Sequence, residues 1–423
     1  MLNGKKASYI ANYFKRFASE VPIIPDPIDS VCKIIIVIPC YNEPALTATL
    51  DSLSACKLPE YTIEVIIVVN QSEEASDNLN ETNQQTIRDF KQWKMRHEDS
   101  ETQRAGKLKF YCLEVLDLPR KQAGVGLARK TGMDEALRRF VSNNQDGTVV
   151  CLDADCRVSS DYLMAINSEF VQSEAGLGEL HFEHSYETEP DPALKNGIIN
   201  YELFLRYYVE GLRQSTFPHA IHTVGSCMLV KASVYAKHGG MNKRKAGEDF
   251  YFLHKIVPHE KFATVTGASV YPSCRTSDRV PFGTGKAQQD WLDLGSQDYL
   301  TYDPRVFTEL KRFIEAVSSF YITPPDHVIP QLPETISEFL IQHGFNHKID
   351  LIRSNCKSER QFHKQFFIWF DGFLCMKFVH FLRDKFYSNI PIEAAASQLI
   401  GCDTRNSEVL LNAYKAIDLK QAT

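Results

Sequence analysis

The amino-acid sequence predicts an α/β fold, with an open sheet flanked by helices and a helical C-terminal region. Up to Leu152, short β-branched apolar runs alternate with helical patterns, an order typical of a parallel sheet with helical crossovers. After Phe307 the apolar residues recur at helical spacing and no clear strand is found. With 423 residues the chain is long enough for two domains.

Four strands are predicted before Asp153, each as an apolar run. The first, Lys33–Pro39, is a β-branched run of the kind found in strands buried on both faces. The other three are expected at Thr62–Val69, Lys109–Val115 and Thr148–Leu152. Between them we expect a helix opening at Pro44, a polar surface helix with a mobile loop within Ser72–Lys107, and a helix over Val125–Val141. Strands joined in this way pair in parallel through right-handed crossovers.

The chain is expected to divide into three parts. Residues 1–32 are expected to form an amphipathic helix and a linker closed by Pro25-Asp26-Pro27, residues 33–305 the sheet-bearing domain, and residues 306–423 a helical domain. Within the last part, Ser358–Tyr387 is predicted to be one long amphipathic helix rich in phenylalanine. It either packs in the core of the helical domain or rests on a membrane, where its aromatic side chains would face lipid.

Composition narrows the class of protein. The balance of 47 basic and 53 acidic side chains, net charge −6, argues against nucleic acid as a partner, because such proteins carry a basic stripe. Met1–Glu20 has no apolar core typical of a signal peptide, and no charge-free apolar stretch is long enough to span a bilayer. The eleven cysteines form no Cys-x-x-Cys pair, which argues against a zinc knuckle. We expect a reducing, cytoplasmic location, with peripheral contact at the inner face of a membrane as the alternative.

Asp153-Ala154-Asp155 directly follows the fourth predicted strand. Two carboxylates at this spacing suit Mg²⁺ or Mn²⁺, which takes its other ligands from water and phosphate, so the substrate is predicted to carry a diphosphate. Aspartate is also common in turns and at helix N-caps, which is the alternative. Tyr41 and Asn70 also fall just past strand ends, where ligands bind in open α/β sheets. These positions predict one shared site.

Five short motifs follow one another along the chain. They are Ile38-Pro39-Cys40-Tyr41-Asn42-Glu43, Gly124-Val125-Gly126-Leu127-Ala128-Arg129, Asp153-Ala154-Asp155, Gly225-Ser226-Cys227-Met228-Leu229-Val230 with Gly239-Gly240-Met241, and Gly247-Glu248-Asp249. Together they resemble family 2 glycosyltransferases of the GT-A fold, a Rossmann-like open mixed sheet, over Lys33 to Thr284. Asn70 stands where many members have an aspartate for the nucleotide base. The Gln-x-x-Arg-Trp motif of the processive synthases is missing, which favours single or limited additions.

The resemblance implies a metal-dependent, inverting, hexosyltransferase-like enzyme that moves a sugar from a nucleoside diphosphate to a hydroxyl acceptor. Asp249 would be the catalytic base, Glu248 an acceptor ligand, and Asp153 and Asp155 the ligands of Mn²⁺ or Mg²⁺. The alternative for Glu248 and Asp249 is a structural one, since acidic residues at a helix start complement the helix dipole. Tyr41 would lie against the nucleobase. Pro39, Glu43 and Asn70 would complete the base and ribose slot.

Basic and histidine residues supply further candidates. Arg129 would contact the donor phosphate or pair with an aspartate of the metal motif, and a surface ion pair is the alternative. Arg275, Arg279 and Lys286 lie in a loop with two glycines that suits a diphosphate, unless the loop is purely structural. A third metal ligand is sought among His181, His184, His219, His222, His254 and His259. Tyr201, Phe204, Arg206, Tyr207 and Tyr208 form a segment that either binds acceptor sugar rings or packs in the core.

Two other functions remain open at this point. A nucleotidyltransferase also uses an α/β sheet and Mg²⁺, but it would need a glycine-rich basic loop after the first strand, and Cys40-Tyr41-Asn42-Glu43 is not one. A catalytically silent nucleotide-sugar-binding protein would bind the donor without turnover. The acceptor could be a glycan, a lipid-linked sugar or a small molecule.

Overall fold

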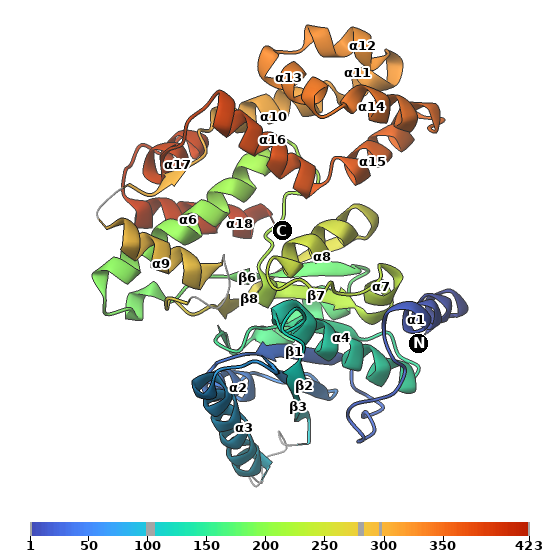
Figure 1. Cartoon of the computed structure of the whole chain (residues 1–423), viewed down its shortest axis with the longest axis vertical. Coiled ribbons are helices and arrows are strands. Elements are labelled where there is room, and N and C mark those ends of the chain that lie inside the picture. Colours follow the sequence, from blue (N-terminus) through green and yellow to red (C-terminus); the bar gives the residue numbers. More distant parts are fainter. Residues whose placement is uncertain (1, 99–105, 278–282, 296–297, 422–423) are drawn as a thin grey trace.

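Among the described residues, the lower half of the molecule in Figure 1 is built on an eight-stranded mixed sheet. The computed structural model describes residues 2–98, 106–277, 283–295 and 298–421. The strands are β1 Ile34–Cys40, β2 Ile63–Ser72, β3 Leu108–Leu118, β4 Thr148–Cys151, β5 Arg157–Val158, β6 Leu177–Phe182, β7 Met228–Lys231 and β8 Phe262–Tyr271. Their order is β3-β2-β1-β4-β7-β6-β8-β5, with β7 antiparallel to both of its neighbours.

The four predicted strands are confirmed as β1 to β4, and they pair in parallel in the order β3-β2-β1-β4. Side chains of β1 alternate between the two faces of the sheet. Ile34, Ile36 and Ile38 pack on one side with α2, α3 and α5, while Ile35 and Val37 pack on the other with α4, α7 and α8. Both faces are covered, which explains why the strand is apolar throughout.

Helices cover both faces of this sheet. The helices and helical turns in this part are α1 Gly4–Phe17, α2 Leu46–Ser54, α3 Asp77–Glu98, α4 Val125–Ser142, α5 Tyr162–Ala165, η1 Ile166–Val171, η2 Tyr186–Thr188, η3 Gly225–Cys227, α7 Ala232–Lys237, α8 Glu248–Ile256, η4 Val257–His259 and α9 Thr284–Leu294. The predicted helices are therefore present, although α2 begins two residues after Pro44. Residues 99–105, within the loop predicted to be mobile, lie outside the described residues.

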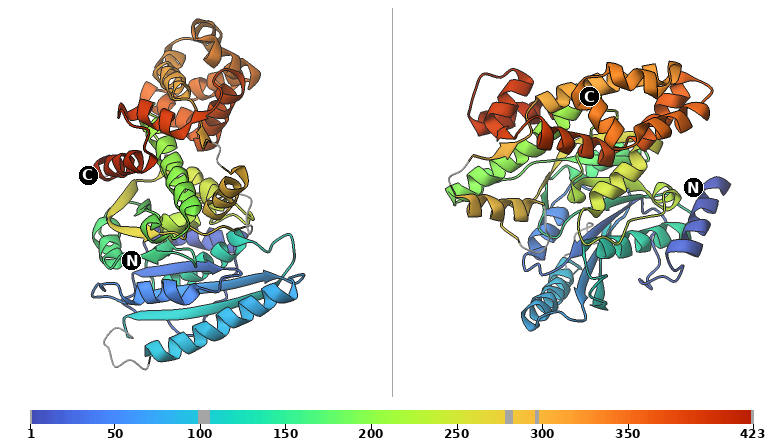
Figure 2. Two further views of the ribbon diagram at one scale, coloured as in Figure 1. Left: turned by 90° about the vertical axis from the view of Figure 1, so that its left-hand side faces the viewer. Right: turned by 45° about the horizontal axis from the view of Figure 1, so that its top comes forward.

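A second, largely aromatic core holds the C-terminal helices together. They are α10 Arg305–Glu315, α11 Val317–Ile322, α12 Pro325–Val328, η5 Ile329–Gln331, α13 Glu334–Gln342, α14 Phe345–Ser354, α15 Glu359–Trp369, α16 Gly372–Lys385, α17 Ile392–Ile400 and α18 Ser407–Gln421. The long helix α6, Pro192–Gln214, joins this core through Ile198, Leu203, Tyr207 and Leu212. Figure 2 shows α6 running from the sheet-bearing part into the C-terminal helices.

Two sequence predictions for the C-terminal region are wrong in detail. Ser358–Tyr387 is not one helix but two, α15 and α16, bent by 71°. The break lies at Phe370 and Asp371, where the Asp371 carboxylate caps α16 by accepting from the backbone N–H groups of Phe373 and Leu374. A short strand also exists in this region, because β10 Ile390–Pro391 pairs with β9 Leu300–Thr301. A strand of only two residues is too short to show the alternating apolar pattern by which strands are predicted from sequence.

Among the described residues, no single helix has both the length and the apolar character to cross a membrane. The bent pair α15 and α16 meets both criteria when its two helices are taken together.

Candidate active site

One cavity of about 1280 Å³ lies beyond the carboxyl ends of β1, β2 and β4. Sequence-predicted site residues that line it are Pro39, Tyr41, Glu43, Asn70, Arg129, Asp153, Asp155, Glu248, Asp249 and Arg275. Arg279 lies outside the described residues. Lys286 is not among the lining residues and pairs with Asp290 on α9. The parallel strands and the loops before α4 and α8 thus gather motifs from distant parts of the chain.

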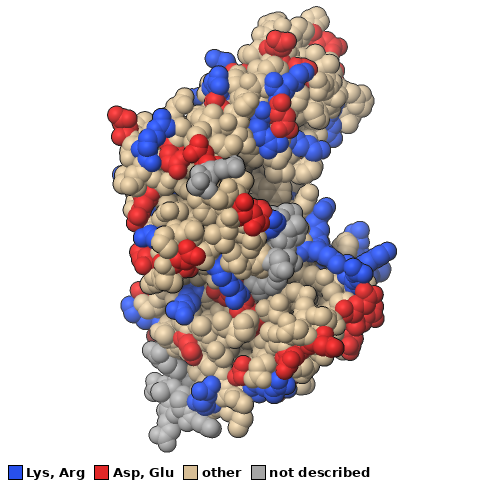
Figure 3. Space-filling model, turned by 60° about the vertical axis from the view of Figure 1, so that its left-hand side comes forward, with Lys and Arg blue, Asp and Glu red and all other residues tan. Residues whose placement is uncertain are grey.

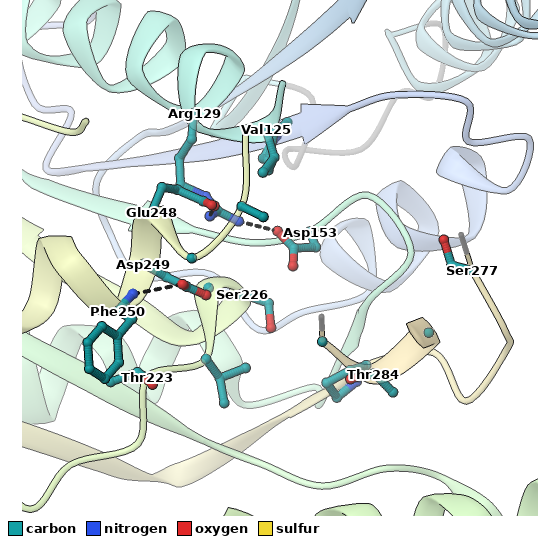
Figure 4. Close-up of a pocket in the computed structure, with 18 of the residues that line it drawn as sticks. Val125, Arg129, Asp153, Thr223, Ser226, Glu248, Asp249, Phe250, Ser277 and Thr284 are labelled. Carbon is teal, nitrogen blue, oxygen red and sulfur yellow. Dashed lines mark hydrogen bonds and ion pairs between the residues drawn. The ribbon is translucent and has the colours of Figure 1, made fainter. Parts of the chain in front are cut away.

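Arg129 lies at the centre of the acidic part of the cavity (Figure 4). It stands in the first turns of α4 and is 1% exposed, so the surface ion pair considered above is wrong. Its Nη2 is 2.5 Å from Asp153 Oδ1, and its Nη1 donates to Glu248 Oε1. A Cβ on Gly225 would lie 2.9 Å from Arg129 Nη2 and 3.0 Å from Asp249 Oδ2. Gly225 therefore lets the guanidinium and the Asp249 carboxylate approach the same point.

One guanidinium faces three carboxylates here, and their charges do not balance. Burial raises the pKa of Asp249, against the opposing effect of Arg129. Burial likewise raises the pKa of Glu248, again opposed by Arg129. Asp249 nevertheless remains partly exposed to the cavity and accepts from the Phe250 backbone N–H at 2.7 Å. A carboxylate with a raised pKa is a stronger proton acceptor, which suits a general base.

Asp153 and Asp155 face the cavity, with side chains 38% and 25% exposed. Among the described residues, no group of three or more His, Cys, Asp or Glu side chains could hold a metal ion by itself. Two carboxylates fit a cation that draws its other ligands from water and a substrate diphosphate, as Mg²⁺ commonly does. The acidic pair thus fits Mg²⁺ or Mn²⁺ only together with a phosphate-bearing substrate.

Arg275 follows β8 and reaches back over the first-strand motif. Its Nη2 is 3.2 Å from Asp155 Oδ2, and its Nη1 donates to Glu43 Oε1 at 3.0 Å. The Glu43 side chain is buried beneath it, and its Oε1 also accepts from the Ala45 backbone N–H at 3.0 Å. Glu43 therefore orients Arg275. The predicted contact of Glu43 with the base and ribose of a nucleoside stays a prediction.

Asn70 is almost fully buried in the wall of the cavity. Its side chain is 1% exposed, and its Nδ2 lies 3.4 Å from the Gly124 carbonyl oxygen. The buried Oδ1 has no hydrogen-bond partner among the described residues. An unpaired buried acceptor is costly, and this side chain would have to rotate for a ligand in the cavity to pair with its Oδ1.

Three of the six candidate histidines, His184, His222 and His254, line the cavity. His184 Nδ1 is 2.8 Å from Glu202 Oε2, and His222 Nε2 is 3.2 Å from Asp418 Oδ2. Burial lowers the pKa of His254 to about 4. A third metal ligand among these residues stays a prediction.

Sequence reasoning missed one wall of the cavity. Gly372, Met376 and His380 of α16 line it, four residues apart on one helix face. On α6, Tyr201, Leu205, Tyr208, Val209 and Leu212 line it as well, while Tyr207 packs in the helical core. Helical spacing reveals such faces, but it does not reveal what they enclose.

Comparison with known proteins shows to which class of enzyme the protein belongs. The family described as Glycosyl transferase family 2 matches residues 35–239, which span β1 to α7. The protein is therefore a glycosyltransferase, and the nucleotidyltransferase alternative is set aside. Residues 35–239 therefore belong to family 2, and the predicted α/β fold, an open mixed sheet flanked by helices with a helical C-terminal region, is confirmed.

Solved structures resemble the chain only remotely. S. aureus TarS, residues 1–349, has 11% identity and a TM-score of 0.40, covering 79% of this chain and 91% of TarS. The same TarS fragment in complex with UDP-GlcNAc gives 12% identity, a TM-score of 0.41 and the same coverage. The mannosyltransferase PcManGT from Pyrobaculum calidifontis, in complex with GDP-Man and Mn²⁺, has 13% identity and a TM-score of 0.36, covering 98% of this chain and 89% of that one. Among curated proteins, no sequence matches the chain.

Proposed function

We propose that the protein is a metal-dependent, inverting enzyme that transfers a sugar from a nucleoside diphosphate to a hydroxyl acceptor. The observation that carries this proposal is the single cavity lined by both Asp249 and the Asp153–Asp155 pair, with Arg129 between them. A base and a diphosphate site at one cavity are what direct displacement at an anomeric carbon requires.

In this proposal the donor occupies the part of the cavity next to β1 and β2. The Tyr41 ring lies against the nucleobase, and the Asn70 amide, in the wall of the cavity, hydrogen-bonds to the nucleoside. Asp153 and Asp155 would hold Mg²⁺ or Mn²⁺, and the bound cation would neutralise charge on the leaving diphosphate. The Arg275 guanidinium, 36% exposed, is available to phosphate oxygens beside the acidic pair.

Asp249 accepts the proton of the acceptor hydroxyl as its oxygen attacks the anomeric carbon. The bond from that carbon to the diphosphate oxygen breaks on the opposite face, so the configuration inverts. A positioned carboxylate base accounts for about 10²–10⁴-fold of the rate. Glu248 is held by Arg129, so we assign it the positioning of that guanidinium; direct acceptor binding stays a prediction.

The test begins with thermal-shift screening of nucleotide-sugars in Mn²⁺, followed by NMR of the product formed from the donor that binds. We expect a product of inverted anomeric configuration and loss of turnover when EDTA removes the cation. A product that retains the anomeric configuration of the donor would overturn direct displacement by the acceptor hydroxyl. Turnover that persists in EDTA would overturn the metal requirement.

A further inference from the structure

The cavity extends past Asp249 into a space that we call the acceptor chamber, walled by α6, α8 and α16. Its aliphatic wall residues are Leu205, Val209, Leu212, Ile221, Val224 and Met376. The cavity as a whole, about 1280 Å³, exceeds the roughly 300–1,000 Å³ of a typical small-molecule pocket. There is thus room for a donor and for a second molecule beside it.

The C-terminal helices close this chamber on the catalytic side. Gly372, at the start of α16, packs on the His254 ring of α8, and a Cβ there would lie 2.1 Å from His254 Cε1. The rings of Tyr251 and Phe373 approach to 5.8 Å between centroids. The surface is hollowed between the C-terminal helices and the sheet-bearing part (Figure 3). The helix that carries the base and the helix that covers the chamber are therefore in direct contact.

Three histidines that line the cavity are engaged within the protein. His184 pairs with Glu202, His222 pairs with Asp418, and His380 Nε2 lies 2.9 Å from the Tyr302 hydroxyl. A bare sugar would need hydrogen bonds for each of its buried hydroxyls, since leaving them unpaired is costly. Aliphatic walls beside engaged histidines favour an apolar ligand instead.

We propose that the acceptor chamber binds the aliphatic chain of a lipid acceptor, with its hydroxyl head group held at Asp249. This inference rests on the proposed function for the role of Asp249, and it adds the substrate class. The chain would lie along the face of α6 formed by Leu205, Val209 and Leu212, with Met376 of α16 above it.

Calorimetric titration with 1-butanol, 1-hexanol and 1-octanol tests the inference, on the full chain loaded with Mn²⁺ and either UDP or GDP. The affinity should rise about fourfold for each added methylene, the gain expected for burying that group. Binding that does not depend on chain length would overturn the inference. Because this series is measured on the wild-type protein, it tests the inference even if a variant fails to fold.

Three variants locate the binding. Leu205→Glu and Met376→Glu should abolish the chain-length dependence, whereas Lys377→Glu, on the exposed side of α16, should keep it. An unchanged dependence in both chamber variants would overturn the inference, because the alcohols would then bind elsewhere. Binding of UDP or GDP should survive in all three variants. If the thermal-shift screen finds no nucleotide-sugar that binds the wild type, the proposed function fails, while the alcohol series still decides what the chamber accepts.

Discussion

At the residue scale, Arg129 joins the two halves of the proposed reaction. Its guanidinium contacts Asp153 on the donor side and Glu248 on the helix that carries Asp249. Buried charges of this kind stay only where partners compensate them. Since the guanidinium contacts Asp153 and Glu248 and also lies near Asp249, a cation beside Asp153 would relieve the mutual repulsion of the three carboxylates. The acidic pair and the base are therefore electrostatically linked.

We expect Asp155→Ala to remove the Mn²⁺-dependent binding of a nucleoside diphosphate. The reason is that half of the carboxylate cradle is lost, and water replaces it poorly as a ligand for a cation already shared with phosphate. Calorimetric titration with UDP and GDP in the presence of Mn²⁺ measures this binding affinity. Asp161→Ala is the matched control, because the Asp161 side chain is 48% exposed, contacts Lys57 and Ser160, and does not line the cavity. Equal affinity in Asp155→Ala and the control would contradict the metal role.

Asp249→Asn should keep donor affinity and lower kcat by two decades or more, about the contribution of a general base. The amide preserves the shape of the carboxylate and can still cap the Phe250 N–H, but it cannot take a proton at neutral pH. Steady-state transfer and donor titration are measured together. If transfer stays near wild type, Asp249 serves only to start α8. A silent binding protein would show no transfer in either form.

At the element scale, the strand ends made most of the site predictable. β1, β2 and β4 run in parallel, so residues at their carboxyl ends must meet at one edge, and Tyr41, Asn70 and Asp153 do so, although Asn70 lies within β2 and not after it. This inference needs only the direction of the strands. The motif around Asp249 required the family resemblance, since a helix start with acidic residues is otherwise unremarkable.

The wall formed by α16 was not predictable in the same way. An amphipathic pattern shows that one face is buried, but the contact between Gly372 and His254 joins segments far apart in sequence. The break before α16 did have a local signal. Asp371-Gly372 is a helix start of the Asp N-cap type, which the long apolar pattern of Ser358–Tyr387 concealed.

The junction of α8 and α16 is expected to weaken in acid. Burial, with a smaller effect from His219, lowers the pKa of His254 to about 4, against about 6.5 in an unfolded chain. The stabilisation from neutral His254 is therefore complete above pH 6.5 and is lost as the pH falls toward 4. Replacing His254 with Phe should reduce the pH dependence of the unfolding free energy across this window by at most about 3 kcal/mol. Urea denaturation at several pH values measures it, and parallel profiles for the two proteins would contradict the assignment.

At the scale of the whole molecule, a buried ionic network ties the C-terminal helix to the sheet-bearing part. Asp418 of α18 accepts from Arg206 and Arg213 of α6 and lies 3.2 Å from His222 Nε2 beside the cavity. Burial raises the pKa of Asp418, but the bond with His222 and the two arginines outweigh it and hold that pKa well below its usual range. Arg206 also donates to the Phe182 carbonyl oxygen of β6. The two parts should therefore unfold together.

Asp418→Ala tests this coupling, because it leaves buried Arg206 with one carboxylate partner fewer. Breaking a buried ion pair costs about 3–5 kcal/mol, whereas Asp403→Ala, at an exposed site, should change stability by no more than about 0.5 kcal/mol. Denaturation is followed by fluorescence in two backgrounds, one retaining only Trp93 of α3 and the other only Trp369 of α15. If the molecule is one cooperative unit, both probes shift to lower denaturant by the same amount. A shift confined to Trp369 would mean that the helical part melts alone, and the acceptor chamber would then open without loss of the donor site.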